Sequence, residues 1–267
     1  MLDAKSARQI AERLHEAERN RRQIRQLSYS WPDLAIDDAY AIQREWVAIK
    51  LSQGRTVRGH KIGLTSRAMQ RSSQINEPDT GELLDDMFFP DAGQIPIERF
   101  IVPRVEIEVA FVLARPLAGG ICTLSDVLTA TDYVVPALEI IDARIEPVDT
   151  QTKTTRRVTD TIADNAANAG VVLGGRTVRP TDVDLRGIPG VLYRNSEVEE
   201  TGVSVAVLNH PANGIAWLAN RLARYGSALA AGEVVLSGSF TRPVAVAAGD
   251  TINAEFGPLG TVSCQFR

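Results

Sequence analysis

Two glutamates two positions apart give this sequence its clearest chemical signal. Apolar and polar residues alternate between Pro103 and Leu113, which is the period of a β-strand with one buried face. Glu106 and Glu108 share the other face, with Cα atoms about 6.5 Å apart from the strand rise. Carboxylates this close repel each other, so we expect a cation between them, and Mg²⁺ prefers such oxygen ligands. The alternative is an edge strand whose solvated face is acidic.

A third glutamate interrupts another apolar run. The segment Asp132–Asp142 predicts a buried strand, and Glu139 lies inside it. A charged residue there is costly unless it is paired or bound to a metal. Three glutamates on two buried strands would leave about three positions of an octahedral cation open, enough for a chelating 2-oxo acid and a water. The cation would then polarise the keto group and stabilise an enolate.

A lysine and an acidic turn are candidates for proton transfer. Lys61 lies in a short predicted strand, Thr56–Thr65, beside glycines that let a ligand or another backbone approach. If it is buried, its pKa would be lowered and it would exchange protons near neutrality. Alternatively, its stem packs and its amine reaches water. Glu77 and Asp79 occupy a turn before an apolar run, where either could line a pocket or satisfy the turn.

The composition fits an ordinary globular protein and argues against several classes. The chain has 267 residues, 44% hydrophobic and 23% charged, which suits one large domain or a core domain with a smaller lobe. A net charge of −4 with no basic stripe argues against nucleic acid as a partner. We find no membrane span and no signal peptide. Cys122 and Cys264 lack metal-ligand spacing, so we expect reduced thiols in a cytoplasmic protein.

Hydrophobic spacing predicts helices in the N-terminal part of the chain. One runs from about Ser6 to Leu27, and a second begins at an N-cap on Asp37 and is closed by Gly54. These two helices resemble a small lobe. Short strands and glycine turns occupy the end of the chain, from Glu233 to Phe266.

Three further expectations concern the second half of the chain. The polar segment Glu146–Val158 is expected at the surface, where it could fold over a site. Arg144 is expected to pair with Asp142, because both lie on one face of a strand. Asn209 is expected to be the N-cap of a helix that has Pro211 in its first turn.

Motifs along nearly the whole chain resemble the hydratase/decarboxylase branch of the fumarylacetoacetate hydrolase superfamily. Each motif alone is weak, but their combination is specific to this branch. The segments that carry the resemblance are residues 59–66 (GHKIGLTS), 72–89, 103–108 (PRVEIE), 136–144 (PALEIIDAR), 164–170 (DNAANAG), 208–214 (LNHPANG) and 238–243 (GSFTRP).

The resemblance implies an α+β fold, with a mixed β-roll core, peripheral helices and a small N-terminal lobe. It implies a mainly helical lobe over residues 1–75 and a catalytic β-roll domain over residues 76–267. It also implies a site in which Lys61 is the catalytic lysine and Asp79 the proton-transfer acid, with Glu77 as a weaker candidate. The implied cofactor is Mg²⁺ or Mn²⁺, held by Glu106, Glu108 and Glu139.

The implied activity is hydration of a 2-oxo dicarboxylate with a remote double bond, in meta-cleavage catabolism of aromatic compounds. The hydrolase branch uses a histidine-centred water activation and commonly an aspartate as third ligand. Glu139 and Lys61 stand in these places here and favour hydratase chemistry. Members are homo-oligomers, often decamers, and associate with other pathway enzymes.

Three alternatives stay open at this point. The same site would serve decarboxylation of a 2-oxo-hexenedioate or hydration of a five-carbon hydroxypentadienoate, and the chain could be a non-catalytic scaffold. A dicarboxylate substrate needs a cation for its distal carboxylate. Arg67, Arg71 and Arg242 are the candidates for that cation.

Overall fold

The computed structural model describes residues 2–118 and 120–267. Its α-helices are α1 (Ala4–Asn20), α2 (Leu27–Ser30), α3 (Ile36–Ser52), α4 (Arg67–Ser72), α5 (Leu124–Ala130), α6 (Val158–Ala163) and α7 (Pro211–Ala223). Its strands are β1 (Val57–Gly63), β2 (Asp79–Leu84), β3 (Phe88–Phe89), β4 (Gly93–Ile95), β5 (Arg104–Leu113), β6 (Thr131–Ile141), β7 (Asn168–Leu173), β8 (Pro189–Arg194), β9 (Glu197–Val203), β10 (Val234–Ser239), β11 (Val244–Ala245), β12 (Thr251–Glu255) and β13 (Thr261–Phe266). Short 3₁₀ turns are η1 (Asp85–Met87), η2 (Ile97–Arg99), η3 (Asn165–Ala167), η4 (Ser204–Ala206) and η5 (Gly257–Leu259).

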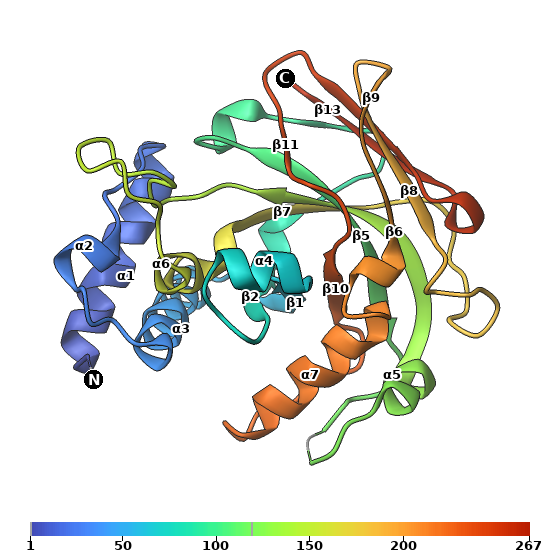
Figure 1. Ribbon diagram of the computed structural model, residues 1–267, viewed down its shortest axis with the longest axis horizontal. Coiled ribbons are helices and arrows are strands. Elements are labelled where there is room, and N and C mark those ends of the chain that lie inside the picture. The colour runs from blue at the N-terminus through green and yellow to red at the C-terminus, as the bar shows by residue number, and fades with distance from the viewer. Residues whose placement is uncertain (1, 119) are drawn as a thin grey trace.

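Two mixed sheets form the centre of the molecule. An eight-stranded sheet has the order β2-β1-β10-β5-β6-β7-β3, with β11 paired to the end of β5, and a five-stranded sheet has the order β4-β13-β12-β8-β9. Most pairs are antiparallel, but β1 with β10, β3 with β7 and β4 with β13 are parallel. Figure 1 shows the long strands curling through the middle of the molecule, with the N-terminal helices at one side and α7 below the strands. The predicted α+β class is confirmed.

The largest core lies where the two sheets face each other and where α5 and α7 cover the strands. On β5 the apolar residues Val105, Ile107 and Val109 point into this core and are fully buried. The alternation predicted for this strand is therefore present, and it turns Glu106 and Glu108 to the opposite face. No helix within residues 2–118 and 120–267 is long and apolar enough to cross a membrane.

The N-terminal helices form a second core with parts of the chain that follow much later. Residues of α1 and α3 pack with Leu84 of β2 and with Ile162 and Ala163 of α6. Strand β1, which lies before residue 75, is paired within the large sheet between β2 and β10. The division into a lobe of residues 1–75 and a domain of residues 76–267 stays a prediction, with β1 on the sheet side of any such boundary.

Helix ends differ from the predictions where backbone conformation overrides side-chain pattern. Helix α1 ends at Asn20 rather than Leu27, because Arg21 adopts a left-handed conformation with φ 51°. Helix α3 begins after Ala35, two residues before the predicted N-cap at Asp37, although Gly54 follows its end as expected. At α7, Asn209 has φ 66° and cannot serve as an extended N-cap. The cap is His210, whose Nδ1 accepts a hydrogen bond from the backbone of the first turn.

Arg144 is fully buried, and its partner is Asp164 rather than Asp142. Its Nε donates to Oδ1 of Asp164 at 2.5 Å, and its backbone N–H donates to the other carboxylate oxygen at 2.8 Å. Asp142 instead accepts the backbone N–H groups of Ile101 and Val102. The predicted pair was wrong because strand β6 ends at Ile141, so the alternation of faces does not extend to Arg144. The actual pair ties the end of β6 to the turn after α6.

We predict that Arg144→Met lowers the free energy of unfolding by about 3–5 kcal/mol, because it leaves a buried aspartate without its partner. Chemical denaturation measures the change. The matched control is Arg8→Met, which breaks an exposed ion pair with Glu12 and is expected to have little effect. Equal losses for both variants would contradict this account of Arg144.

Candidate active site

Strands β5 and β6 place three glutamates on one face of the eight-stranded sheet. Glu106 stands directly opposite Glu139 in the antiparallel register, and Glu108 lies two residues along on the same face. One carboxylate oxygen from each residue lies within 4.8 Å of the other two. In the described part of the chain, this is the one group of three such side chains with metal-ligand spacing. The carboxylates converge as the strand pattern indicated, and their role as ligands stays a prediction.

The glutamate cluster is buried and poorly compensated. Glu108 and Glu139 expose 1% and 0% of their surface. Neither carboxylate oxygen of Glu139 has a hydrogen-bond partner of acceptable geometry among the described residues. Burial, followed by repulsion from Glu139, raises the pKa of Glu106 to about 8 and the pKa of Glu108 well above its ordinary value. Buried oxygens without partners are rare in proteins, and a coordinated cation would satisfy them.

Lys61 on β1 lies against this cluster. Its Nζ is 3.2 Å from Oε1 of Glu139 and donates a hydrogen bond to the carbonyl oxygen of Ala166 at 3.3 Å. Burial lowers the pKa of Lys61, but Glu139, Asp79 and the other glutamates raise it by more, so the net shift is upward. The predicted lowering was wrong, because it counted burial and omitted the neighbouring carboxylates.

Asp79 begins strand β2 and is brought to Lys61 by a glycine. Asp79 is paired with Gly63 in the β1–β2 register. A Cβ atom at Gly63 would collide with Oδ1 of Asp79 and would lie 3.3 Å from Nζ of Lys61. Oδ1 of Asp79 is buried without a hydrogen-bond partner, and burial raises the pKa of this carboxyl in spite of Lys61. The close approach of another backbone that was expected beside a glycine occurs at Gly59, where a Cβ atom would collide with the carbonyl oxygen of Val234, whereas the neighbour at Gly63 is a side chain.

A left-handed turn forms another wall of the site. Asn165, Ala166 and Ala167 have φ of 49°, 51° and 59°, which costs energy for residues with a side chain. The Asn165 side chain offsets part of this cost, because it accepts from the backbone N–H of Glu82 and donates to its carbonyl, like an added strand. The turn presents the carbonyl of Ala166 to Lys61. Ala166 and Ala167 of this turn line a cavity.

A cavity of about 460 Å³ joins these parts. Four of the five predicted site residues line it, namely Lys61, Asp79, Glu106 and Glu108, and Glu139 is fully buried beside Lys61. The other walls include residues 62–66, 68–69, 166–167, 200–201 and 239–243. At the end of β10, the backbone N–H of Gly238 donates to Oε2 of Glu108 at 2.7 Å, which fixes that carboxylate.

The remaining sequence candidates lie in different surroundings. Glu77 pairs with Arg221 at 3.0 Å and does not line the cavity. Arg67 and Arg71 are exposed and do not line it either. Arg242 does line it, but its side chain is 86% exposed and pairs with Glu200. The sequence reasoning also missed Arg156, which reaches the cavity from the segment expected at the surface.

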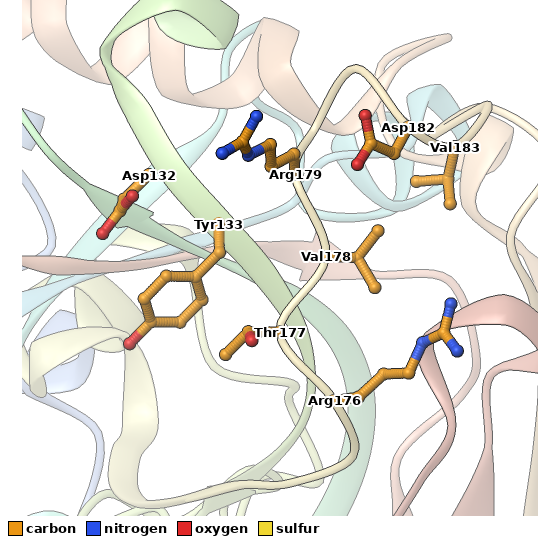
Figure 2. A pocket seen from close by; sticks show the side chains of 8 residues that line it. All are labelled: Asp132, Tyr133, Arg176, Thr177, Val178, Arg179, Asp182 and Val183. Atoms are coloured by element: carbon orange, nitrogen blue, oxygen red, sulfur yellow. The ribbon is translucent and has the colours of Figure 1, made fainter.

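A larger hollow of about 560 Å³ lies elsewhere on the surface, between the start of β6 and the segment after β7. Figure 2 shows its charged side chains, Asp132, Arg176, Arg179 and Asp182, pointing apart rather than toward a common point. This hollow contains no group of carboxylates with metal-ligand spacing among the described residues. The chemistry of the chain is therefore concentrated in the smaller cavity.

Comparison with known proteins decides the family. The family model described as the C-terminal part of fumarylacetoacetate hydrolase matches residues 60–267. The chain belongs to the fumarylacetoacetate hydrolase family. This family member is 59% identical to 2-oxo-hept-4-ene-1,7-dioate hydratase of Escherichia coli, over 100% of both chains. It is 41% identical to 2-keto-4-pentenoate hydratase of Paraburkholderia xenovorans, over 97% of this chain and 94% of the relative.

A solved relative has the same fold over its whole length. The 4-oxalocrotonate decarboxylase of Pseudomonas putida G7, complexed with magnesium and adipate, superposes with a TM-score of 0.94. It is 36% identical, and the match covers 100% of this chain and 99% of that one. The resemblance drawn from the motifs and the fold that it implied for this fumarylacetoacetate hydrolase family member are thus confirmed.

The donor set of this family member fits a divalent cation. Three carboxylates are hard oxygen ligands, and their separation allows one ion to bind an oxygen from each. The unpartnered oxygens of Glu139 would coordinate the cation. The raised pKa values of Glu106 and Glu108 agree with this, because they reflect negative charge that no cation offsets. Lys61 and Asp79 line the same cavity as Glu106 and Glu108.

We predict that Glu139→Gln weakens Mg²⁺ binding by at least about 10-fold, because it replaces a charged carboxylate ligand by a neutral amide. Isothermal titration calorimetry measures the affinity. Glu82→Gln is the matched control. Glu82 stands opposite His60 in the register of β1 and β2, so its side chain lies on the other face of the sheet from Lys61. Wild-type protein that binds no divalent cation would argue against a metal site and would revive the scaffold alternative.

Proposed function

We propose that this chain hydrates 2-oxo-hept-4-ene-1,7-dioate to 4-hydroxy-2-oxoheptane-1,7-dioate in meta-cleavage catabolism of aromatic compounds, on the homoprotocatechuate route. The identity of 59% along the full length of a hydratase with this substrate carries the proposal. The cavity supports it, because buried carboxylates, a lysine and an aspartate meet there in the arrangement that proton transfer on a 2-oxo acid requires.

The proposed cofactor is Mg²⁺ or Mn²⁺, with Glu106, Glu108 and Glu139 as its ligands. Support comes from the convergence of their oxygens and from the magnesium bound by the decarboxylase relative. When bound, the cation would act as a Lewis acid toward the 2-oxo group and hold the substrate by that end. Gly238 keeps Glu108 in place through its backbone N–H.

Lys61 and Asp79 are the proposed proton-transfer groups. Removal of a proton from C3 and its return at C5 bring the double bond into conjugation with the 2-oxo group. Water then adds across it, with the hydroxyl at C4 and the proton at C3. Coordination would offset the glutamate charges that raise the pKa of Lys61, which leaves burial lowering that pKa and Asp79 raising it. The carbonyl of Ala166 orients the amine.

A second candidate keeps the site and changes the reaction. The chain shares its whole fold with a 4-oxalocrotonate decarboxylase, so decarboxylation of 2-oxo-hex-3-ene-dioate is the nearest alternative. Hydration of 2-hydroxypenta-2,4-dienoate is the other, since a 2-keto-4-pentenoate hydratase is 41% identical. Identity favours the seven-carbon hydratase over both, because 59% is well above 41% and 36%.

We predict that Lys61→Ala and Asp79→Asn each lower kcat on the seven-carbon diacid by about 100- to 10,000-fold, because each removes a proton-transfer group. Loss of dienoate absorbance in the presence of Mg²⁺ measures turnover. Both variants should keep their circular dichroism spectrum and their Mg²⁺ binding. Normal hydration by either one would remove that residue from the mechanism.

The same assay separates the candidate reactions. Wild-type protein is incubated with the seven-carbon diacid, the six-carbon diacid and the five-carbon monoacid, with and without Mg²⁺. The proposal requires fastest consumption of the seven-carbon diacid without release of CO₂. Release of CO₂ from the six-carbon diacid as the fastest reaction would establish the decarboxylase instead.

We also propose that the protein acts in the cytoplasm as a homo-oligomer, a decamer as in its family, and associates with other enzymes of its pathway. A partly exposed apolar patch on the large sheet supports self-association. It consists of Phe88, Val112, Tyr133 and Leu173, which pack against a small buried cluster. Val112 and Tyr133 are neighbours across β5 and β6, so the patch is continuous there.

We predict that Val112→Glu lowers the mass in solution, because it places a charge in this patch. Light scattering after size exclusion measures the mass. Val102→Glu is the matched control, since Val102 is 47% exposed and lies outside the patch. A monomeric wild-type protein at micromolar concentration would refute the oligomer.

A further inference from the structure

Three cations line the cavity, and two of them are accounted for. Lys61 lies against the glutamates. Arg242 is mostly exposed and bonds to Glu200 at 2.7 Å, so its charge is shared with solvent and with a carboxylate of the cavity wall. Arg156 is the third. It stands in the polar segment between β6 and α6, far from the glutamates in sequence.

One guanidinium nitrogen of Arg156 has no hydrogen-bond acceptor among the described residues. Its Nη1 is shielded from solvent and makes no hydrogen bond within the described residues. Three carboxylates act on the charge of Arg156, those of Asp164, Asp160 and Asp79. Asp164 binds Arg144, and Asp160 accepts from Ser28 and from the backbone N–H of Arg157. Asp79 lines the same cavity but, within the described residues, makes no hydrogen bond to Nη1 of Arg156. Burial lowers the pKa of Arg156 in spite of these carboxylates, so its charge is under-compensated. A buried donor without a partner is costly and rare.

The segment that carries Arg156 is built to hold it in place. Val148 and Thr155 form a β-bridge, and the backbone N–H of Arg156 donates to Pro147 at 3.0 Å. The connection between α1 and α2 holds this segment as well. Arg25 makes two hydrogen bonds to Asp149, and Gln26 donates to the carbonyl of Thr154 at 2.9 Å. A surface segment anchored in this way is a wall of the site rather than a free loop.

We propose that Arg156 binds the carboxylate of the substrate that is remote from its 2-oxo group and thereby selects dicarboxylates over monocarboxylates. The inference rests on the proposed function, because it takes the 2-oxo end to lie at the glutamates. A guanidinium offers a planar pair of donors that matches a carboxylate. A dicarboxylate would satisfy Arg156 as it binds, whereas a monocarboxylate would leave the arginine buried and unpaired.

The experiment compares a diacid with a monoacid in one variant. Arg156→Met removes the charge at similar length, and kcat/KM is measured for the seven-carbon 2-oxo diacid and for 2-hydroxypenta-2,4-dienoate. Calorimetry with the Mg²⁺-loaded protein adds the affinities of heptanedioate and heptanoate, which need no turnover. We expect kcat/KM and affinity for the diacids to fall about 10- to 100-fold, with changes below about 3-fold for the monoacids. Arg156→Lys should recover part of the loss.

The matched control is Arg157→Met on the same segment. Arg157 is exposed, donates to the carbonyl of Pro32 and does not line the cavity. In Arg157→Met, kcat/KM and affinity for the diacids and the monoacids should therefore stay at wild-type values. Equal losses for diacid and monoacid in Arg156→Met would show a structural role and overturn the inference, as would no loss for either. If Arg156→Met does not fold, Arg156→Gln takes its place in the same comparison.

Failure of the proposed function would be recognised separately. If wild-type protein does not hydrate the seven-carbon diacid, the function is wrong. The binding of heptanedioate and heptanoate still decides whether Arg156 recognises a second carboxylate.

Discussion

Mutual repulsion among three converging carboxylates, two of them fully buried, is the constraint on which the site depends. Glu106 and Glu139 oppose each other across two central strands, and Glu108 is the next side chain on that face. Like charges in this arrangement destabilise a sheet. The neighbouring apolar faces of β5 and β6, packed in the main core, hold the strands in register against that repulsion. The protein therefore spends folding energy to keep a high negative potential where a cation would be bound.

Backbone detail, rather than side-chain bulk, completes the site around this cluster. Gly63 lets Asp79 reach Lys61, and Gly238 turns its N–H to Glu108. The left-handed turn at Ala166 directs a carbonyl at the lysine amine. Each feature is locally unfavourable for an ordinary residue, and each is stabilised by contacts from another segment, such as the buried pair of Arg144 with the aspartate that precedes the turn.

The sequence predicts what depends on short-range periodicity. Alternation placed Glu106 and Glu108 on one strand face, and a charge inside an apolar run singled out Glu139. Features set by backbone conformation or by distant contacts were beyond it. The left-handed Asn209 moved the helix cap to His210, and the partner of Arg144 came from 20 residues along the chain. The upward shift in the pKa of Lys61 comes from carboxylates on other strands, whose proximity short-range periodicity does not reveal.

The cavity is lined by two kinds of structure, and this suggests how one fold could serve several substrates. The glutamates and Lys61 lie on central strands whose register is fixed by the core, so the positions of these side chains resist change. Arg156 lies on a connecting segment, where insertions and substitutions are tolerated without disturbing the sheet. Relatives that share the residues on the strands but differ on the connecting segment would keep the same chemistry and act on another substrate. Because Arg25 and Gln26, in the connection between α1 and α2, anchor that segment, the N-terminal part of the chain would contribute to the proposed recognition without lining the cavity.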